Sequence, residues 1–115
     1  MKILILDDDL ARHKSFARKF IGHSLTHTET VEDCIEQLKY GNWDGVFLDH
    51  DLGGLQMVES GGNEPTGYDV AVWMNENPDA WNAREVYIHS FNPEGAARMQ
   101  RLIPESYLTP GCWCN

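Results

Sequence analysis

The sequence ILILDDD at residues 3–9 and the sequence VFLDHD at residues 46–51 share one pattern. Each begins as a short run of large apolar side chains and ends abruptly in aspartates. Such runs, bounded by polar residues, are typical of strands in a parallel sheet that is covered on both faces. Ligands of these sheets bind at the carboxyl ends of the strands. We therefore predict that two buried strands deliver carboxylates to one edge of a sheet.

Carboxylates that share one edge repel each other unless a cation or shared protons offset their charge. A hard divalent cation is the simplest solution, and oxygen ligands without a thiolate favour Mg²⁺ or Mn²⁺. His50, between Asp49 and Asp51, leaves a borderline metal such as Zn²⁺ open. The alternative for the acidic run after the first strand is that it only caps the following helix, and for Asp9 we predict only that role.

Composition limits the classes of function. A length of 115 residues predicts one domain spanning 1–115, and a 42% hydrophobic content is globular. No apolar stretch is long enough for a membrane span and no signal peptide is evident, so we expect a cytoplasmic protein. Three cysteines cannot all pair within one chain, which fits a reducing compartment. A net charge of −9 argues against broad nucleic-acid binding, although a metal-bound site still admits a small anionic substrate. The oligomeric state is not indicated.

Strands and helices are predicted to alternate along the chain as βαβαβαβαβ. This order favours a doubly wound α/β fold with a five-stranded parallel sheet and helices on both faces. The predicted strands are Lys2–Leu6, Ser24–Thr28, a strand ending at Asp49, Glu85–Ser90 and Ser106–Leu108. The predicted helices are Leu10–Ile21, a helix from Thr30 to just before Gly41, Gly67–Glu76, and a helix after Asn92-Pro93.

Apolar spacing predicts which helix faces are buried, and turn residues predict where the helices end. In the first helix we expect Phe16, Ala17, Phe20 and Ile21 on one face, with Gly22 in the left-handed conformation after the helix end. Thr30 is the expected N-cap of the second helix. Its buried stripe is predicted to be Val31, Cys34, Ile35 and Leu38, and that of the last helix Ala96, Met99 and Ile103.

The strand-end residues resemble those of response-regulator receiver domains, which have a CheY-like, flavodoxin-like fold. Asp7-Asp8 resemble the acidic pair, Asp49 the phospho-acceptor aspartate and Ser90 the hydroxyl residue. The resemblance implies that Asp8 and Asp49 ligate Mg²⁺ directly, that Asp7 acts partly through water, and that the backbone carbonyl of Asp51 completes the site. Ser90 would contact a phosphoryl oxygen. Receivers also have a lysine after their fifth strand, but this chain has none after Lys39, which counts against an ordinary phosphorylation switch.

A closer resemblance is to the cyclic-phosphate processing receiver-like proteins of phages and bacteria. The motifs that carry it are Asp7-Asp8-Asp9 with Arg12-His13, residues 47–54 (FLDHDLGG), residues 66–68 (TGY), residues 89–93 (HSFNP) and a tryptophan near the C-terminus. The resemblance implies hydrolysis of a cyclic phosphate, as on RNA ends or ADP-ribose. The implied partner is a small phosphorylated substrate, such as a nucleotide or an RNA end.

The residues suit that chemistry on their own terms. Histidine side chains ordinarily titrate near neutrality, which makes His50 and His89 candidates for proton transfer, while Ser90, Asn92 and the N–H groups that open the last helix would cradle a phosphate. Arg12 is a candidate phosphate ligand. Each has an alternative: His50 pairs with neighbouring carboxylates, His89 is structural, and Arg12 with His13 lies on a solvated basic face. Asp49 is either a metal ligand that orients water or a nucleophile.

The segment Leu52–Pro65 is longer than most loops of α/β units and contains four glycines. A lid over the substrate and a disordered loop are the two interpretations. Two functional hypotheses remain. The first, which we favour, is that the chain is an enzyme, a metal-dependent phosphoesterase. The second is that it is a non-catalytic, stand-alone receiver-like module, which either binds a partner or nucleotide without turnover or is phosphorylated as a signalling receiver.

Overall fold

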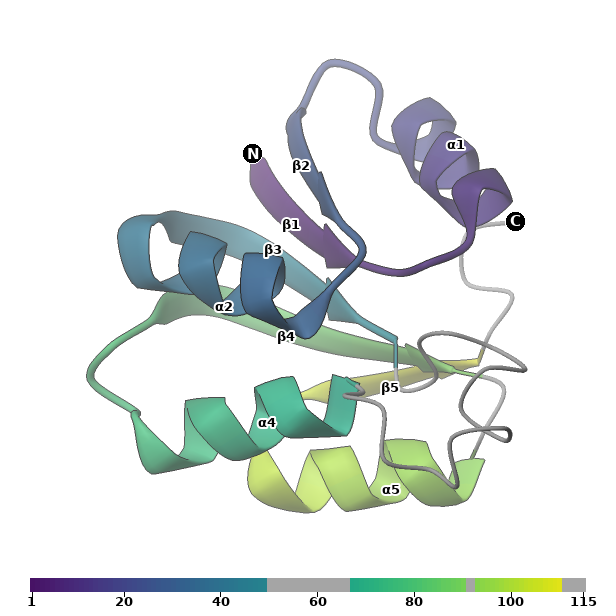
Figure 1. Cartoon of the computed structure of the whole chain (residues 1–115). Helices are drawn as coiled ribbons and strands as arrows, with labels where there is room; N and C mark the ends of the chain where they lie inside the picture. The colour runs from purple at the N-terminus through teal and green to yellow at the C-terminus, as the bar shows by residue number, and fades with distance from the viewer. Residues whose placement is uncertain (50–66, 91–92, 111–115) are drawn as a thin grey trace.

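The structure is a computed structural model that describes residues 1–49, 67–90 and 93–110 (Figure 1). Within these ranges the chain forms five parallel strands and four helices in alternation, which confirms the predicted fold class. The strands are β1 (Lys2–Leu6), β2 (Ser24–Thr28), β3 (Asn42–Leu48), β4 (Asn82–Ser90) and β5 (Tyr107–Pro110). The helices are α1 (Leu10–Lys19), α2 (Val31–Tyr40), α4 (Gly67–Glu76) and α5 (Pro93–Leu102).

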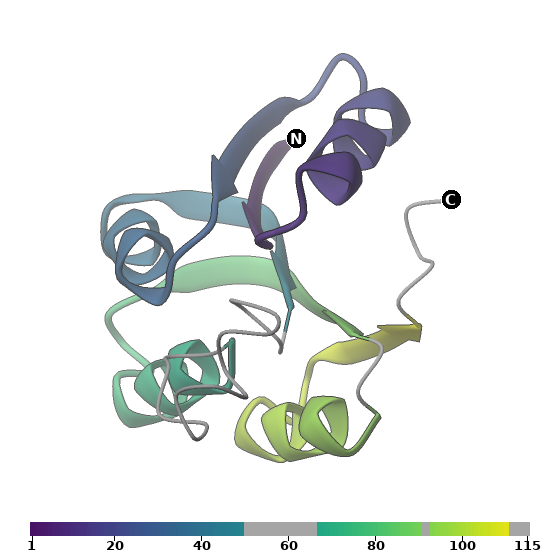
Figure 2. The ribbon, with the colours of Figure 1, turned by 45° about the vertical axis from the view of Figure 1, so that its right-hand side comes forward.

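The sheet order β2-β1-β3-β4-β5 reverses direction between the first and second crossovers. Because strand–helix–strand crossovers keep one hand, a reversal of direction places the connecting helix on the opposite face. Figure 2 shows this arrangement, with α1 on one side of the sheet and α2, α4 and α5 on the other. The switch point lies between β1 and β3, where ligands of open α/β sheets bind.

Side chains on β1, β3 and β4 alternate between two apolar clusters. In β1, Leu4 and Leu6 join the larger cluster under α2, α4 and α5, whereas Ile3 and Ile5 join a smaller cluster with Phe16 of α1. Asp7, the next residue in this alternation, continues the α1 side. The same two-residue period runs through Phe47 and Tyr87, which pack on the α1 side.

The predicted face of α1 was partly wrong. The helix ends at Lys19, Phe20 is its C-cap, and Ile21 is 83% exposed. The buried side chains of α1 are His13 and Phe16, and Phe20 packs against the same cluster. Gly22 does have a positive φ of 89°, so the left-handed turn was predicted correctly and comes right after the helix ends.

The other helices follow their predicted patterns. Thr30 caps α2 by accepting a hydrogen bond from the backbone N–H of Asp33, at 3.1 Å. The predicted stripes of α2 and α5 lie in or against the larger cluster. Three strands differ from their predicted bounds, since β3 ends at Leu48 and not at Asp49, β4 begins at Asn82, and β5 runs from Tyr107 to Pro110. No helix in the described ranges has both the length and the apolar character needed to cross a bilayer.

Candidate functional site

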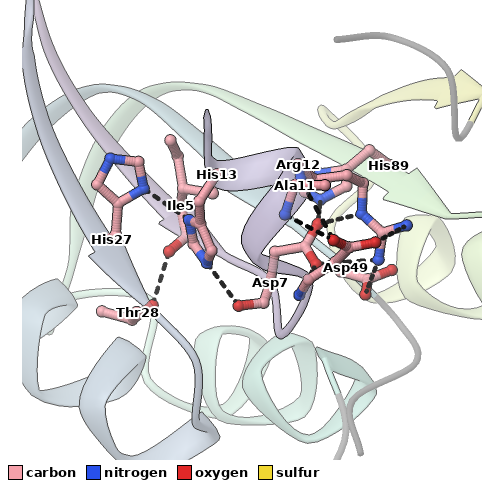
Figure 3. A network of polar contacts seen from close by, with 10 residues as sticks. Ile5, Asp7, Ala11, Arg12, His13, His27, Thr28, Asp49 and His89 are labelled. Atoms are coloured by element: carbon pink, nitrogen blue, oxygen red, sulfur yellow. Dashed lines mark hydrogen bonds and ion pairs between the residues drawn. The ribbon is translucent and has the colours of Figure 1, made fainter. Parts of the chain in front are cut away.

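Three strand ends meet at the carboxyl edge of the sheet and bring Asp7, Asp49 and His89 together. The register pairs Leu6 with Leu48 and Leu48 with Ile88, so the residue that follows each of these lies at one level. All three are buried, with exposed fractions of 0%, 3% and 2% respectively. Figure 3 shows them close together beside the first turn of α1.

The geometry of the acidic group suits one cation. One carboxylate oxygen from each of Asp7, Asp8 and Asp49 lies within 4.8 Å of the others. Two oxygens on opposite sides of one Mg²⁺ are about 4.2 Å apart, since each metal–oxygen distance is about 2.1 Å. A small inward movement would therefore let the three residues share one ion. Oxygen donors alone favour Mg²⁺ or Mn²⁺ over softer metals.

Arg12 lies among these carboxylates. Its Nε–H donates to Asp7 Oδ2 at 2.6 Å, and its Nη2 donates to Asp7 Oδ1 at 2.9 Å and to Asp49 Oδ2 at 3.4 Å. Its Nη1 is 3.5 Å from Asp9 Oδ2. The hydrogen bond to Asp7 is the main cause that raises the pKa of Arg12 above its ordinary value. The alternative that Arg12 lies on a solvated face is therefore wrong, since its side chain is 21% exposed and bonded to carboxylates.

Asp7 is surrounded by donors. Besides the two Arg12 bonds, Oδ1 accepts from the backbone N–H of Asp9 at 2.8 Å and Oδ2 lies 2.8 Å from His89 Nε2. Burial by itself would raise the pKa of Asp7. Hydrogen bonds from His89, Arg12 and the Asp9 backbone outweigh it and lower the pKa to about 2. Asp7 is therefore an anion across the physiological pH range.

The contact between His89 and Asp7 defines which ring nitrogen carries the proton. Because the Asp7 carboxylate can only accept, Nε2 of His89 must donate. In the neutral ring Nδ1 is then the unprotonated nitrogen, and it is buried with no hydrogen-bond partner among residues 1–49, 67–90 and 93–110. The ring is held edge-on against Phe16, with centroids 5.3 Å apart. His89 thus has a fixed orientation, and its Nδ1 accepts no hydrogen bond from the part of the chain that the structure describes.

His13 contacts the backbone of Asp7 and is itself in contact with His27. His13, for which a solvated face was the alternative interpretation, is buried, and its Nε2 lies 2.7 Å from the backbone carbonyl oxygen of Asp7. Its Nδ1 lies 2.6 Å from Nδ1 of His27, an exposed residue on the edge strand β2. The signal was available in the sequence, since His13 precedes Phe16 and Phe20 by three and seven residues on one helical face.

The structure thus brings five predicted site residues to one place: Asp7, Asp8, Asp49, Arg12 and His89. Asp9 acts as the predicted helix cap, because its Oδ1 accepts from the N–H groups of Ala11 and Arg12. His50, Asp51, Asn92 and the proposed lid Leu52–Pro65 lie outside the described residues, and only the backbone of Ser90 is described. The roles assigned to these residues stay predictions.

Solved structures with the same fold are receiver domains. One is a response regulator of Thermotoga maritima in complex with Mg²⁺–BeF, with 17% sequence identity and a TM-score of 0.69 over 94% of this chain and 84% of that chain. Another is the signal receiver domain of an HD domain-containing protein from Pseudomonas fluorescens, with 10% identity and a TM-score of 0.72 over 97% and 82%. The Thermotoga regulator was also solved with a histidine kinase. At these identities the likeness establishes the fold alone.

Sequence comparison is more specific. The chain has no significant match among curated protein sequences. The profile of the family described as the cyclic-phosphate processing receiver domain matches residues 2–105, which include every element from β1 to α5 and all five clustered site residues. The chain therefore belongs to the cyclic-phosphate processing receiver family.

Proposed function

We propose that this chain is a metal-dependent phosphoesterase that hydrolyses a cyclic phosphate. The observation that carries the proposal is the cation-sized group of Asp7, Asp8 and Asp49 beside a buried histidine with one unused ring nitrogen. Family membership supplies the substrate class, and a nucleotide or an RNA end with a cyclic phosphate is the substrate that we expect.

Asp8 and Asp49 are the direct ligands in this proposal, and Asp7 contributes through water. The ion would be Mg²⁺ or Mn²⁺, and it supplies charge neutralisation on the non-bridging phosphate oxygens. The exposed position of Asp8 leaves its carboxylate reachable from solvent, whereas Asp49 is buried at the strand end. The two residues follow β1 and β3, the strands that flank the switch point.

Ring opening needs an attacking oxygen, a broken phosphorus–oxygen bond and a proton for the departing alkoxide. His89 is the candidate for proton transfer, because Asp7 orients its ring and leaves Nδ1 as the basic nitrogen. His50 is the second candidate. Asp49 acts as a ligand that orients water or as the nucleophile itself. Ser90 and Asn92, with the first N–H groups of α5, would hold the phosphate.

The second candidate function is a receiver-like module that binds a partner or nucleotide without turnover. Two observations favour it. Arg12 already offsets part of the charge of Asp7 and Asp49 without a metal, and a structural neighbour was solved with a histidine kinase. The absence of any lysine after Lys39 counts against an acyl-phosphate switch.

Metal-dependent turnover separates the two candidates. ³¹P NMR would follow 2′,3′-cyclic nucleotides and ADP-ribose 1″,2″-cyclic phosphate with Mg²⁺ or Mn²⁺ and wild-type, Asp49→Asn or Asp79→Asn protein. Asp79 is exposed and makes the same change of charge away from the site. We expect metal-dependent ring opening in the wild type and Asp79→Asn, and none in Asp49→Asn. Turnover by Asp49→Asn at the wild-type rate would contradict a catalytic role for Asp49, whereas no turnover across the panel by any protein would favour the binding module.

A further inference from the structure

We propose that Arg12 is an internal cation that a divalent metal must displace, and that the displaced guanidinium then binds the substrate phosphate. The inference rests on the metal-binding part of the proposed function and does not require hydrolysis. It assigns an order to binding at this site, with the metal first and the phosphate second.

The position of the guanidinium is the first reason to expect that a metal must displace Arg12. Nη2 of Arg12 is bonded to Asp7 and Asp49, two of the three residues whose oxygens would share one metal. The same group is close to Asp9 through Nη1. Figure 3 shows the guanidinium against both strand-end carboxylates. The arginine thus already binds two of the three carboxylates that the ion would need.

The hydrogen bonds of Asp7 are a second, independent reason to expect that Arg12 must be displaced. A carboxylate has about four lone-pair positions. On Asp7 they are used by two donors from Arg12, one from His89 and one from the Asp9 backbone. His89 and the Asp9 N–H are attached to the sheet edge and the helix start, so Arg12 is the donor on a flexible stem. For Asp7 to accept from a metal or a metal-bound water, Arg12 has to leave.

Charge and geometry decide where Arg12 goes. A divalent ion close to a guanidinium repels it in this partly buried position, where charge interactions are stronger than in water. Arg12 lies in the first turn of α1, which begins at the carboxyl edge of the sheet. Its planar fork of N–H donors matches the oxygens of a phosphate. The freed side chain therefore supplies a phosphate ligand that the metal-free protein holds back.

Metal affinity is the first test. Free Mn²⁺ measured by electron paramagnetic resonance would give the affinity of wild-type, Arg12→Gln and Arg18→Gln protein. Arg18 is exposed on the same helix, so its removal controls for the loss of one positive charge. We expect Arg12→Gln to bind Mn²⁺ about tenfold more tightly than Arg18→Gln, which corresponds to about 1.4 kcal/mol. Equal or weaker binding would overturn the inference.

A measurement on the unmodified protein covers the case in which Arg12→Gln does not fold. The ¹⁵N resonance of the Arg12 Nε–H group would be followed as Mg²⁺ is added. We expect a shift toward the position of solvent-exposed arginines, and a further shift when inorganic phosphate is added. An unchanged resonance at saturating Mg²⁺ would overturn this inference but not the proposed function. Absence of metal binding by the wild type and every variant would instead overturn the metal site, and with it the proposed function.

Discussion

Asp7 differs from Asp8 in how its charge is balanced. Asp8 is exposed, whereas Asp7 is fully buried and accepts hydrogen bonds from Arg12, His89 and the Asp9 backbone. The charged form of Asp7 is thus part of the folded structure even without a metal. Asp7 is best described as the residue that positions Arg12 and His89, in addition to its place beside the ion.

The Asp7→Asn variant should lose stability in metal-free buffer. The folded-state pKa is about 2 against an ordinary value of 3.8, so the carboxylate stabilises the fold above about pH 4. This contribution is lost as the pH falls from about 4 to about 2, because the unfolded state binds protons first. At neutral pH we expect Asp7→Asn to cost about 2 kcal/mol, from about 1.4 kcal/mol per pKa unit.

Urea unfolding at several pH values would measure this cost, with Asp79→Asn as the exposed control. The difference between wild type and Asp7→Asn should be constant above pH 5 and shrink below pH 4. An Asp7→Asn protein as stable as the wild type at pH 7 would contradict the assignment of a stabilising anion.

His89→Ala should lower turnover with little change in Mn²⁺ affinity. Loss of a positioned acid or base typically costs about 10²–10⁴-fold in rate. His23→Ala is the control, since His23 is exposed and bonded to the N-terminal amino group at the far end of β1. Rates from ³¹P NMR would decide the matter, and an unchanged rate in His89→Ala would leave the residue with a structural role.

At the scale of elements, α1 covers one face of the sheet and also supplies side chains to the site at the sheet edge. Asp9 caps its first turn, which positions Arg12 over the strand ends and directs His13 toward the carbonyl of Asp7. Further along, Phe16 closes the small cluster on that face. A change in where α1 begins would therefore move Arg12 relative to both Asp7 and Asp49.

The junction between α2 and β3 is a tight contact of a different kind. Gly41 is the C-cap of α2, and the indole of Trp43 packs over it while its Nε1–H donates to the carbonyl of Gln37 at 3.2 Å. A Cβ on Gly41 would lie 2.8 Å from the indole ring. The ring is buried and hydrogen-bonded, so it has little freedom to move away.

We expect Gly41→Ala to reduce the free energy of unfolding by about 1–3 kcal/mol, the usual cost of overpacking. Gly45→Ala is the matched control in β3, because its Cβ would meet nothing nearer than 3.7 Å. That variant should be neutral or slightly stabilising, since alanine restricts the unfolded chain. Denaturant unfolding would compare the two, and equal stability would show that Trp43 adapts without cost.

At the scale of the whole molecule, the site lies where two unequal clusters end. The larger cluster under α2, α4 and α5 and the smaller one under α1 share β1 and β3, and both strands stop at the acidic edge. On the α1 side, stacked rings of Phe47, Tyr87 and Tyr107 cross adjacent strands with centroids 4.8 and 5.3 Å apart. A divalent ion at this edge would join residues from two strands and the turn after β1.

Metal should therefore stabilise the entire fold. An ion that binds the folded chain and not the unfolded one adds about 2.7 kcal/mol at a hundred times its Kd. We expect Mg²⁺ to raise the unfolding free energy of the wild type in this way, and to have little effect on Asp49→Asn. NaCl at matched ionic strength is the control, because screening alone affects a chain of net charge −9. An equal effect of NaCl would contradict specific binding.

The sequence by itself determined the strands that reach the site and the carboxylates at their ends. Buried strands show as continuous apolar runs, and helix caps show as local residues such as Thr30, so both can be predicted from neighbours along the chain. The bounds Lys2–Leu6, Ser24–Thr28 and Gly67–Glu76 were predicted without error. The predicted bounds of the edge strand β5 were wrong by one residue at its start and two at its end. The strand is short and its described side chains, Tyr107 and Leu108, are exposed, so its hydrophobic pattern is weak.

Only the tertiary structure decided how the charges pair. Arg12 contacts Asp49 and His89 contacts Asp7 across separations of 37 and 82 residues. Such contacts depend on how α1 lies over the sheet and on the register of β1, β3 and β4. Neither is encoded in local spacing, because an amphipathic helix specifies which face it buries but not its exact position over the strands. The acidic edge was therefore visible in the sequence, whereas the pairing of Arg12 with its carboxylates was not.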